Sequence, residues 1–178
     1  APANKHFAGW NTSSSGSGTN YTVGTSYTVT GNVTLYAQWA LNPKYSVTYN
    51  KNGGSGTMTD PSSPYYDGSS FTVRSNTFTA PANKHFTGWN TASDGSGTSY
   101  TAGTSYTISG NVTLYAQWAY NAQYAVTYNA NGGSGTMTDP SSPYYENTRF
   151  TVRSNSFTAP TNKHFTGWNT ATDGSGTN

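Results

Sequence analysis

The chain has 178 residues, a formal net charge of +2, only 8% charged residues and no cysteine. This composition excludes disulfide staples and thiol chemistry, and the lack of any basic run excludes a nucleic-acid patch or a polybasic membrane signal. No stretch approaches 18 consecutive apolar residues, so no segment is expected to span or insert into a membrane. Aromatic residues reach 15%, and Thr, Ser, Asn and Gly fill most of the remainder. Residues that favour strands thus alternate with residues that favour turns, which predicts an all-β or β-rich fold.

The sequence repeats itself with a 79-residue period. Trp10, Trp89 and Trp168 are separated by this interval, and TLYAQW at 34–39 returns at 113–118. Self-similarity at a fixed period predicts a tandem array in which each repeat is one structural unit. We therefore expect small repeat units arranged end to end.

The boundaries of the repeats are placed where the copies diverge most. We interpret 40–44 and 119–123 as linkers. They leave the C-terminal part of a unit at 1–39, one complete unit at 45–118, and the N-terminal part of a further unit at 124–178. Linkers of about five residues predict neighbouring units with restricted hinge motion.

Five segments of the complete unit alternate apolar and polar residues, and each is predicted to be a strand. In chain order they are Tyr45–Asn50, Phe71–Asn76, His85–Asn90, Ser105–Ile108 and Asn111–Trp118. The last is the strongest, because every second residue from Val112 to Trp118 is apolar and falls on one face. No segment has a convincing helical period, and at most Ser62–Tyr66 could begin one turn of helix.

The motif KHFTGWN at 84–90 returns in every copy, with Ala8 in place of Thr in the first. Phe86 and Trp89 fall on opposite faces of an ideal strand, so we expect a bulge at Gly88 or packing on both faces. His85 is the one imidazole of the unit. The few carboxylates are not spaced as a metal cluster, so no metal ligand is predicted.

The motifs taken together resemble a known family. Tyr45–Gly54, Phe86–Thr98 and Asn111–Trp118 are similar to the three parts of the Listeria–Bacteroides repeat, the internalin-type B-repeat, and the likeness covers nearly every residue. The resemblance implies a β-grasp-like (SUMO- or ubiquitin-like) unit in an extracellular, cell-surface protein of a bacterium or archaeon. It also implies stalk, adhesion or scaffold function, with no catalytic site and no cofactor.

The sequence gives less support to an anion site, a calcium site, a covalent crosslink or a catalytic site than to a structural role. Asn52–Gly56 lacks the Lys-Ser/Thr ending of a phosphate loop, so we expect a turn there. Asp94–Gly97 could contribute to a calcium loop, but Ser15 stands in the place of Asp94 in the first copy. Lys84 recurs in all copies and is the candidate for an isopeptide crosslink, although no buried carboxylate can be placed beside it. Ser, His and Asp occur without a nucleophile elbow, so catalytic residues are not predicted.

Aromatic and Asn side chains supply the remaining candidates. The candidate packing or binding aromatics are Phe86, Trp89, Tyr115, Trp118, Tyr65 and Tyr66. We expect most of them in the core or between units, because a small unit must bury the apolar surface it has. The smaller number of these aromatic side chains that remain exposed could bind a glycan or a protein. Candidate glycosylation sequons lie at Asn11, Asn20, Asn32 and Asn111, and their use depends on the source organism.

The primary functional prediction is a non-catalytic extracellular structural repeat of a stalk, adhesin shaft or surface filament. Its expected partners are neighbouring repeats and other copies in a filament, with no nucleic acid. The alternative is a surface module that binds a glycan or protein through exposed Tyr and Trp. The sequence lacks an initiator Met, and its first and last units are incomplete. Both features predict that it is a segment of a longer array, in which adjoining repeats complete the two outer units. Strand addition between chains is the other interpretation of these ends.

Overall fold

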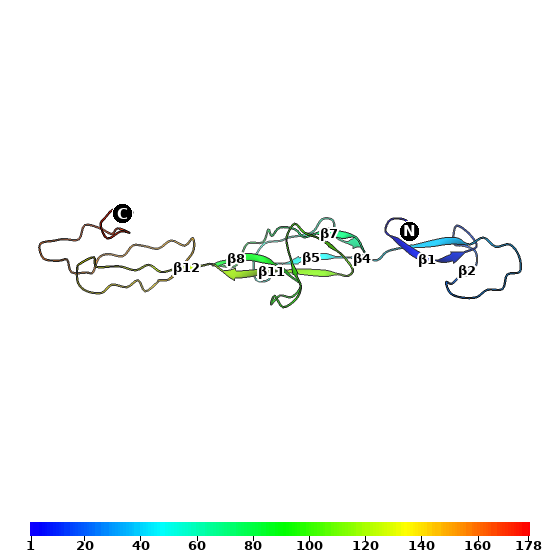
Figure 1. Ribbon diagram of the computed structural model, residues 1–178, viewed down its shortest axis with the longest axis horizontal. Helices are drawn as coiled ribbons and strands as arrows, with labels where there is room; N and C mark the ends of the chain where they lie inside the picture. Colours follow the sequence, from blue (N-terminus) through cyan, green and yellow to red (C-terminus); the bar gives the residue numbers. More distant parts are fainter. The chain divides into compact units, whose positions relative to one another are not determined.

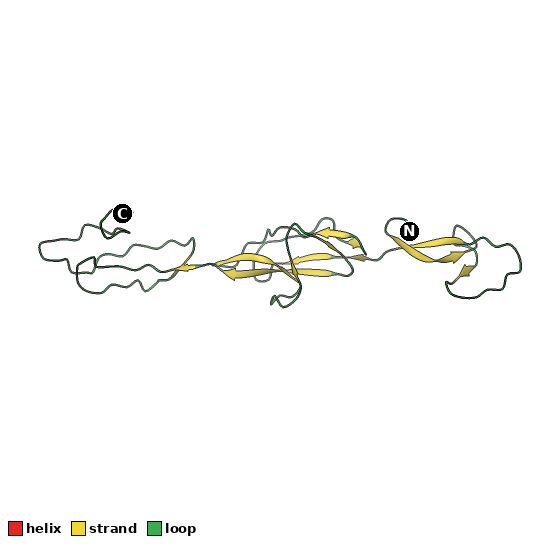
Figure 2. Ribbon diagram, viewed as in Figure 1, coloured by secondary structure: helices red, strands yellow, loops and turns green.

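The computed structural model describes all residues from 1 to 178. Its regular elements are all strands, drawn in yellow in Figure 2, and the all-β prediction is confirmed. The β-grasp detail is not confirmed, because no helix packs on any of the sheets. The segment Ser62–Tyr66, where a helical turn could have begun, instead ends in strand β6 (Tyr65–Tyr66). No helix that could cross a bilayer is present.

The central copy is built on a four-stranded sheet (Figure 1). Its strand order is β5 (Val47–Asn50), β11 (Val112–Tyr120), β8 (Lys84–Asn90) and β9 (Ser99–Tyr100). β5 and β11 run parallel, with Val112 opposite Val47 and Leu114 opposite Tyr49. The main strand at the start of the repeat therefore pairs with the strand that ends it.

Two short antiparallel ladders complete this copy. β7 (Ser70–Thr72) pairs with β10 (Ser105–Thr107), and β4 (Lys44–Tyr45) pairs with β6. The five predicted strands are all present, but β7 is shorter than the predicted Phe71–Asn76. The ladder becomes irregular after Thr72, where Val73 N still donates to Thr104 O at 3.0 Å.

Trp89 lies at the centre of the core and exposes 1% of its surface. Its ring centroid is 4.9 Å from that of Tyr49 and 5.0 Å from that of Phe86, and its Nε1 donates to Arg74 O at 3.0 Å. Burying a side chain of this size contributes about 2–3 kcal/mol. The buried core consists of Val47, Tyr49, Phe71, Val73, Phe78, Trp89, Ile108, Leu114 and Ala116.

The repeated motif contains a bulge. In the first copy, β1 (Lys5–Asn11) pairs with β3 (Tyr36–Leu41), and the register shifts between Phe7 and Gly9. Gly9 has φ +141° and its counterpart Gly88 has φ +156°, a region that other residues rarely adopt. The bulge predicted at Gly88 is confirmed at the matching position of the first copy, and it turns the flanking aromatic rings to the same side.

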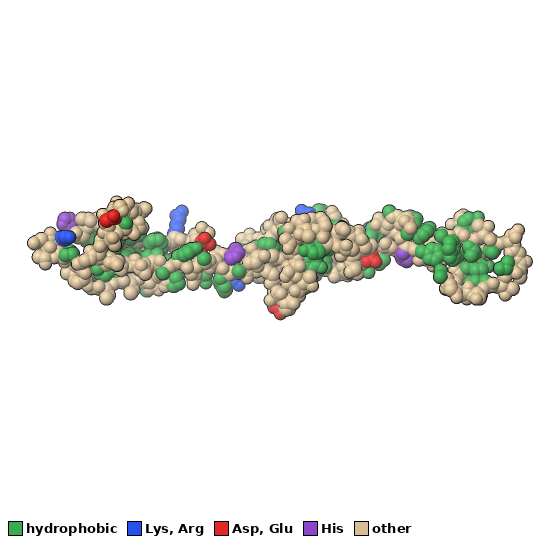
Figure 3. Space-filling model, in the orientation of Figure 1, with side chains coloured by type: hydrophobic (Ala, Val, Ile, Leu, Met, Phe, Trp, Pro, Cys, Tyr) green, Lys and Arg blue, Asp and Glu red, His purple; other side chains and the backbone are tan.

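The outer copies have fewer strands than the central one. In the first, β2 (Asn20–Tyr21) joins β1 and β3 in the order β2-β1-β3. In the third, β12 (Gln123–Tyr124) pairs with β13 (Tyr144–Tyr145). Trp10 exposes 38% of its surface where Trp89 exposes 1%. Figure 3 shows apolar side chains gathered on the surface of the first copy.

The chain divides into two compact units, 1–81 with 86–119, and 82–85 with 120–178. Most residues expected to be linkers belong to strands. β3 continues to Leu41 and β4 begins at Lys44, so only two residues separate them. β11 continues to Tyr120 in the same way.

Candidate functional site

A short connection between the first and central copies carries a set of hydrogen bonds centred on Asn42. Its backbone N donates to Asn4 O at 2.9 Å, and its Oδ1 lies 3.1 Å from His6 Nδ1. Because an amide oxygen only accepts, His6 must donate from Nδ1. On the other side Asn42 Nδ2 donates to Asp67 O at 3.4 Å, and Asp67 N donates to Pro43 O at 2.8 Å. One connecting residue thus bonds to both repeats that it joins.

The connection that follows the central copy repeats most of these bonds. Asn121 N donates to Asn83 O at 2.8 Å, His85 Nδ1 lies 3.0 Å from Asn121 Oδ1, and Glu146 N donates to Ala122 O at 2.7 Å. We name the two sets, around Asn42 and Asn121, the junction contacts. Pro43 and Ala122, which differ between the two connections, take part in these hydrogen bonds through their backbone carbonyl oxygens, so a change of side chain there does not remove the bond.

Each junction also holds a lysine over a tyrosine ring, but not at equivalent positions. Lys44 Nζ lies 4.4 Å from the ring centroid of Tyr66, and Lys84 Nζ lies 4.5 Å from that of Tyr120. The Tyr120 ring in turn stacks on Tyr145 with centroids 6.1 Å apart. Such cation–π contacts contribute about 0.5–1 kcal/mol at exposed sites. Lys84, the isopeptide candidate, therefore lies against an aromatic ring.

A buried asparagine organises the loop after the KHFTGWN strand, and sequence reasoning missed it. Asn90 is 2% exposed. Its Nδ2 donates to Gly95 O, Gly97 O and Ser99 Oγ at 3.1 to 3.2 Å. Its Oδ1 accepts from Ala92 N at 2.8 Å and from Gly97 N at 3.0 Å. The only signal in the sequence was that Asn-Thr and Gly-Ser-Gly recur at a constant spacing in every copy.

Four of the candidate aromatics lie in or against the core: Trp89, Phe86, Trp118 and Tyr65. Trp89 is buried, and Phe86 contacts both Trp89 and Trp118, with ring centroids 5.0 and 5.7 Å away. Trp118 Nε1 donates to Lys51 O and Asn52 O, both at 3.1 Å. These rings hold the end of β11 against the turn after β5.

The three candidate tyrosines do not form one surface. Tyr65 donates from its hydroxyl to Asp60 Oδ2 at 2.8 Å, and burial together with this bond raises its pKa. Tyr66 lies under Lys44 at the junction, and Tyr115 is half-buried on β11.

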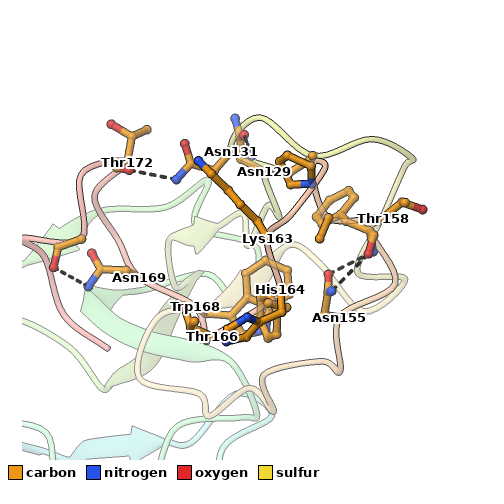
Figure 4. A pocket seen from close by; sticks show the side chains of 18 of the residues that line it. Asn129, Asn131, Asn155, Thr158, Lys163, His164, Thr166, Trp168, Asn169 and Thr172 are labelled. Carbon is orange, nitrogen blue, oxygen red and sulfur yellow. Dashed lines mark hydrogen bonds between the residues drawn. The ribbon is translucent and has the colours of Figure 1, made fainter.

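A hollow of about 380 Å³ opens in the third copy (Figure 4). Asn131, Gly133, Phe165 and Trp168 are among the residues that line it. His164 and Lys163 also border it, but no group of three or more His, Cys, Asp or Glu side chains lies close enough to hold a metal ion.

The two Gly-containing loops considered for ligand binding are held by their own hydrogen bonds. Gly54 N donates to Lys51 O at 2.9 Å, as expected of a turn. Asp94 Oδ1 accepts from Ser96 N at 3.0 Å and from Ser96 Oγ at 2.7 Å, and these bonds lower the pKa of its carboxyl.

The four sequon asparagines differ in accessibility. Asn20, Asn32 and Asn111 are exposed. Asn11 is fully buried, and its Nδ2 donates to Gly16 O and Gly18 O, both at 3.1 Å. A glycan on Asn11 would have to break the same loop network that Asn90 makes in the central copy.

A family model and two known proteins match this sequence. The model of the Listeria-Bacteroides repeat domain matches residues 3–38, 45–117 and 124–178. A "Putative Gly-rich membrane protein" of Evansella cellulosilytica is 37% identical over 137 residues, which are 72% of this chain and 15% of that protein. A "Putative membrane protein" of the same organism is 39% identical over 143 residues, 69% of this chain and 19% of that protein.

The chain spans less than a fifth of the length of these two relatives. No solved structure matches. The family match covers nearly every residue and coincides with the 79-residue repeat, so the chain belongs to the Listeria-Bacteroides repeat family.

Proposed function

We propose that this chain is a non-catalytic structural segment of an extracellular stalk, adhesin shaft or surface filament. The observation that supports this role is the recurrence of the junction contacts. Asn42 and Asn121 make the same backbone bond and the same histidine contact, 79 residues apart. A spacer requires each unit to meet the next in the same way, and bonds on both sides of a two-residue connection restrict its hinge motion.

In this proposal the chain lies outside the cell, at the cell surface. The family is typical of surface-associated proteins, and both relatives carry names of membrane proteins. The partners are then the neighbouring repeats of the same protein. The glycan-binding alternative has less support, because Trp89, Phe86 and Trp118 pack against one another.

Spin labels across the first junction test the spacer role. The chain has no cysteine, so Ser14→Cys and Ala102→Cys place one label on the first copy and one on the central copy, both at exposed positions. We expect a narrow distance distribution. Asn42→Gly should broaden it at least about twofold because the contacts to His6 and Asp67 are lost, whereas Asn32→Gly in an exposed loop should not.

A distribution that is already broad in the unsubstituted junction would contradict the spacer role. A glycan array with the same chain separates the two functions. Specific glycan binding that is lost when Tyr115 and Tyr65 are replaced would favour the binding module.

A further inference from the structure

Strands β5 and β11 carry the chain into and out of the central copy, and they are direct neighbours in its four-stranded sheet (Figure 1). They run parallel, with Val112 opposite Val47 and Tyr115 opposite Asn50. The start of β5 therefore lies beside the start of β11, and the end of β11 lies at the opposite end of the sheet. Tension on the chain before β5 and after β11 pulls the two strands past each other along their own axes.

Hydrogen bonds hold the two strands together beyond the ladder itself. At its start, Ser46 N donates to Asn111 Oδ1 at 2.8 Å. At its end, Trp118 Nε1 donates to the carbonyls of Lys51 and Asn52, both at 3.1 Å. Because the bonds of a ladder run from strand to strand, a force along the strands loads all of them together. The pair is thus held from one end to the other against sliding.

The apolar face of this pair excludes water. Val47, Tyr49 and Leu114 are all buried. On the other face, Thr48 Oγ1 lies 2.9 Å from Thr113 Oγ1 across the two strands. Hydrogen bonds are stronger beside a low-dielectric core, where water cannot replace a partner that moves away. The ladder is therefore shielded from water on its buried side while it is under load.

Two further hydrogen bonds hold β5 to segments outside the ladder. Val47 N donates to Ser63 Oγ at 2.9 Å, and Arg74 N donates to the hydroxyl oxygen of Tyr49 at 2.9 Å. Sliding of β5 breaks these bonds as well. A slip of one residue also turns Val47 and Tyr49 out of the core, because side chains alternate along a strand. No nearby register exists in which β5 keeps its contacts.

We propose that the β5–β11 pair is a mechanical clamp, so that a complete repeat carries tension along the chain. Because the two strands are neighbours, the load passes directly from one to the other and bypasses the residues between 51 and 111. Resistance to forced unfolding depends on the rate of unfolding and not on equilibrium stability alone. The inference deepens the proposed function, since a stalk that is anchored at one end and held at the other is under tension.

Force spectroscopy on the 178-residue chain tests the clamp. Pro43→Cys and Ala122→Cys place one handle in each connection, at equivalent exposed positions of a chain without cysteine. The outer copies then lie outside the handles and bear no load. We expect one unfolding step with an extended length of about 270 Å, because 79 residues separate the handles and each extended residue spans about 3.4 Å.

A second attachment geometry is the matched control. Ser109 is exposed and precedes β11, so handles at Pro43→Cys and Ser109→Cys pull the adjacent starts of β5 and β11 apart. This geometry opens the ladder one bond at a time. At the same pulling speed we expect an unfolding force at least about threefold lower than between residues 43 and 122. Equal forces in the two geometries would overturn the proposal.

Two valine substitutions separate the clamp from overall stability. Val47 on β5 and Val73, which follows β7, are both buried, so Val47→Ala and Val73→Ala remove the same atoms from the core. We expect similar losses in urea unfolding. Only Val47→Ala should lower the unfolding force between residues 43 and 122, by at least about 30%, because forced unfolding follows the barrier. An equal fall in force for both would contradict the clamp.

The comparison of the two geometries needs no core substitution, so it decides the proposal even where an alanine variant does not fold. Its outcome is also distinct from that of the spin-label experiment at the junction. Narrow label distances with equal forces in both geometries would support the spacer role and reject the clamp. Broad label distances with a high force between residues 43 and 122 would support the clamp and reject the spacer role.

Discussion

Replacing Asn90 with Ala tests whether one buried side chain holds the loop of each repeat. The amide of Asn90 donates three hydrogen bonds and accepts two, and the residue is 2% exposed. Replacement by alanine removes all of these hydrogen bonds at once and leaves the partner groups in place. Two backbone N–H groups, of Ala92 and Gly97, then face an apolar methyl group.

The expected cost follows from these bonds. A hydrogen bond contributes about 0.5–1.5 kcal/mol net, and a buried group left without a partner costs about 1–3 kcal/mol. Water can reach part of the loop, because the residues from Asp94 to Ser99 are exposed. We therefore expect Asn90→Ala to lower the free energy of unfolding of the central copy by about 3–4 kcal/mol, a large part of the 5–15 kcal/mol typical of a domain.

The third copy provides a matched comparison. Asn169 makes bonds of the same geometry to Gly174 O and Gly176 O, both at 3.1 Å, but its surroundings are exposed. Water can replace these bonds, so Asn169→Ala should cost only about 1 kcal/mol. Hydrogen exchange read by mass spectrometry on peptides around each loop gives both values in one chain. Equal costs at the two sites, or a cost below about 1 kcal/mol at Asn90, would refute the argument from burial.

Two further predictions concern the same copy. Burial raises the pKa of Tyr49 above its usual 10.0, so the stabilisation from the neutral phenol is present below pH 10 and is lost as the pH rises further. Tyr49→Phe should therefore flatten the fall of the melting temperature between roughly pH 9 and 11, and an unchanged slope would contradict it. A Cβ on Gly97 would overlap Thr91 Oγ1 and lie 2.8 Å from Asn90 Oδ1, so Gly97→Ala should cost about 2 kcal/mol in urea unfolding. Gly110→Ala, with open space around it, should change stability by less than about 0.5 kcal/mol, and equal effects would argue against the overlap.

Much of the fold could be predicted from the residues. Alternation located the strands, and it placed Leu114 and Ala116 on the buried face, where both are fully enclosed. The conflict between Phe86 and Trp89 in an ideal strand predicted the bulge. These features are local, because they depend on period and on glycine conformation within a few residues.

The features that escaped prediction depend on distant parts of the chain. The parallel pairing of β5 with β11 joins residues about 65 positions apart, and alternation says nothing about which strands pair. The hydrogen bonds of Asn90 depend on how a Gly-rich loop folds back, and Asn in such a segment is equally typical of an exposed turn. The segment Ser62–Tyr66 was ambiguous because five residues are too few to show a period.

Nearly identical segments differ in burial because of what lies beside them. Trp10 and Trp89 occupy the same motif, yet one is 38% exposed and the other 1%. Tyr49 and Phe78 pack on Trp89, with ring centroids 4.9 and 6.1 Å away, and they account for its burial. A repeat of this kind closes by pairing its first main strand with its last, so its core requires both ends of the same 79-residue segment. In arrays of simple stacked helices, by contrast, each repeat can add to its neighbour alone. Truncation inside one of these repeats should therefore uncover the whole core face, which makes the repeat the cooperative unit of the array.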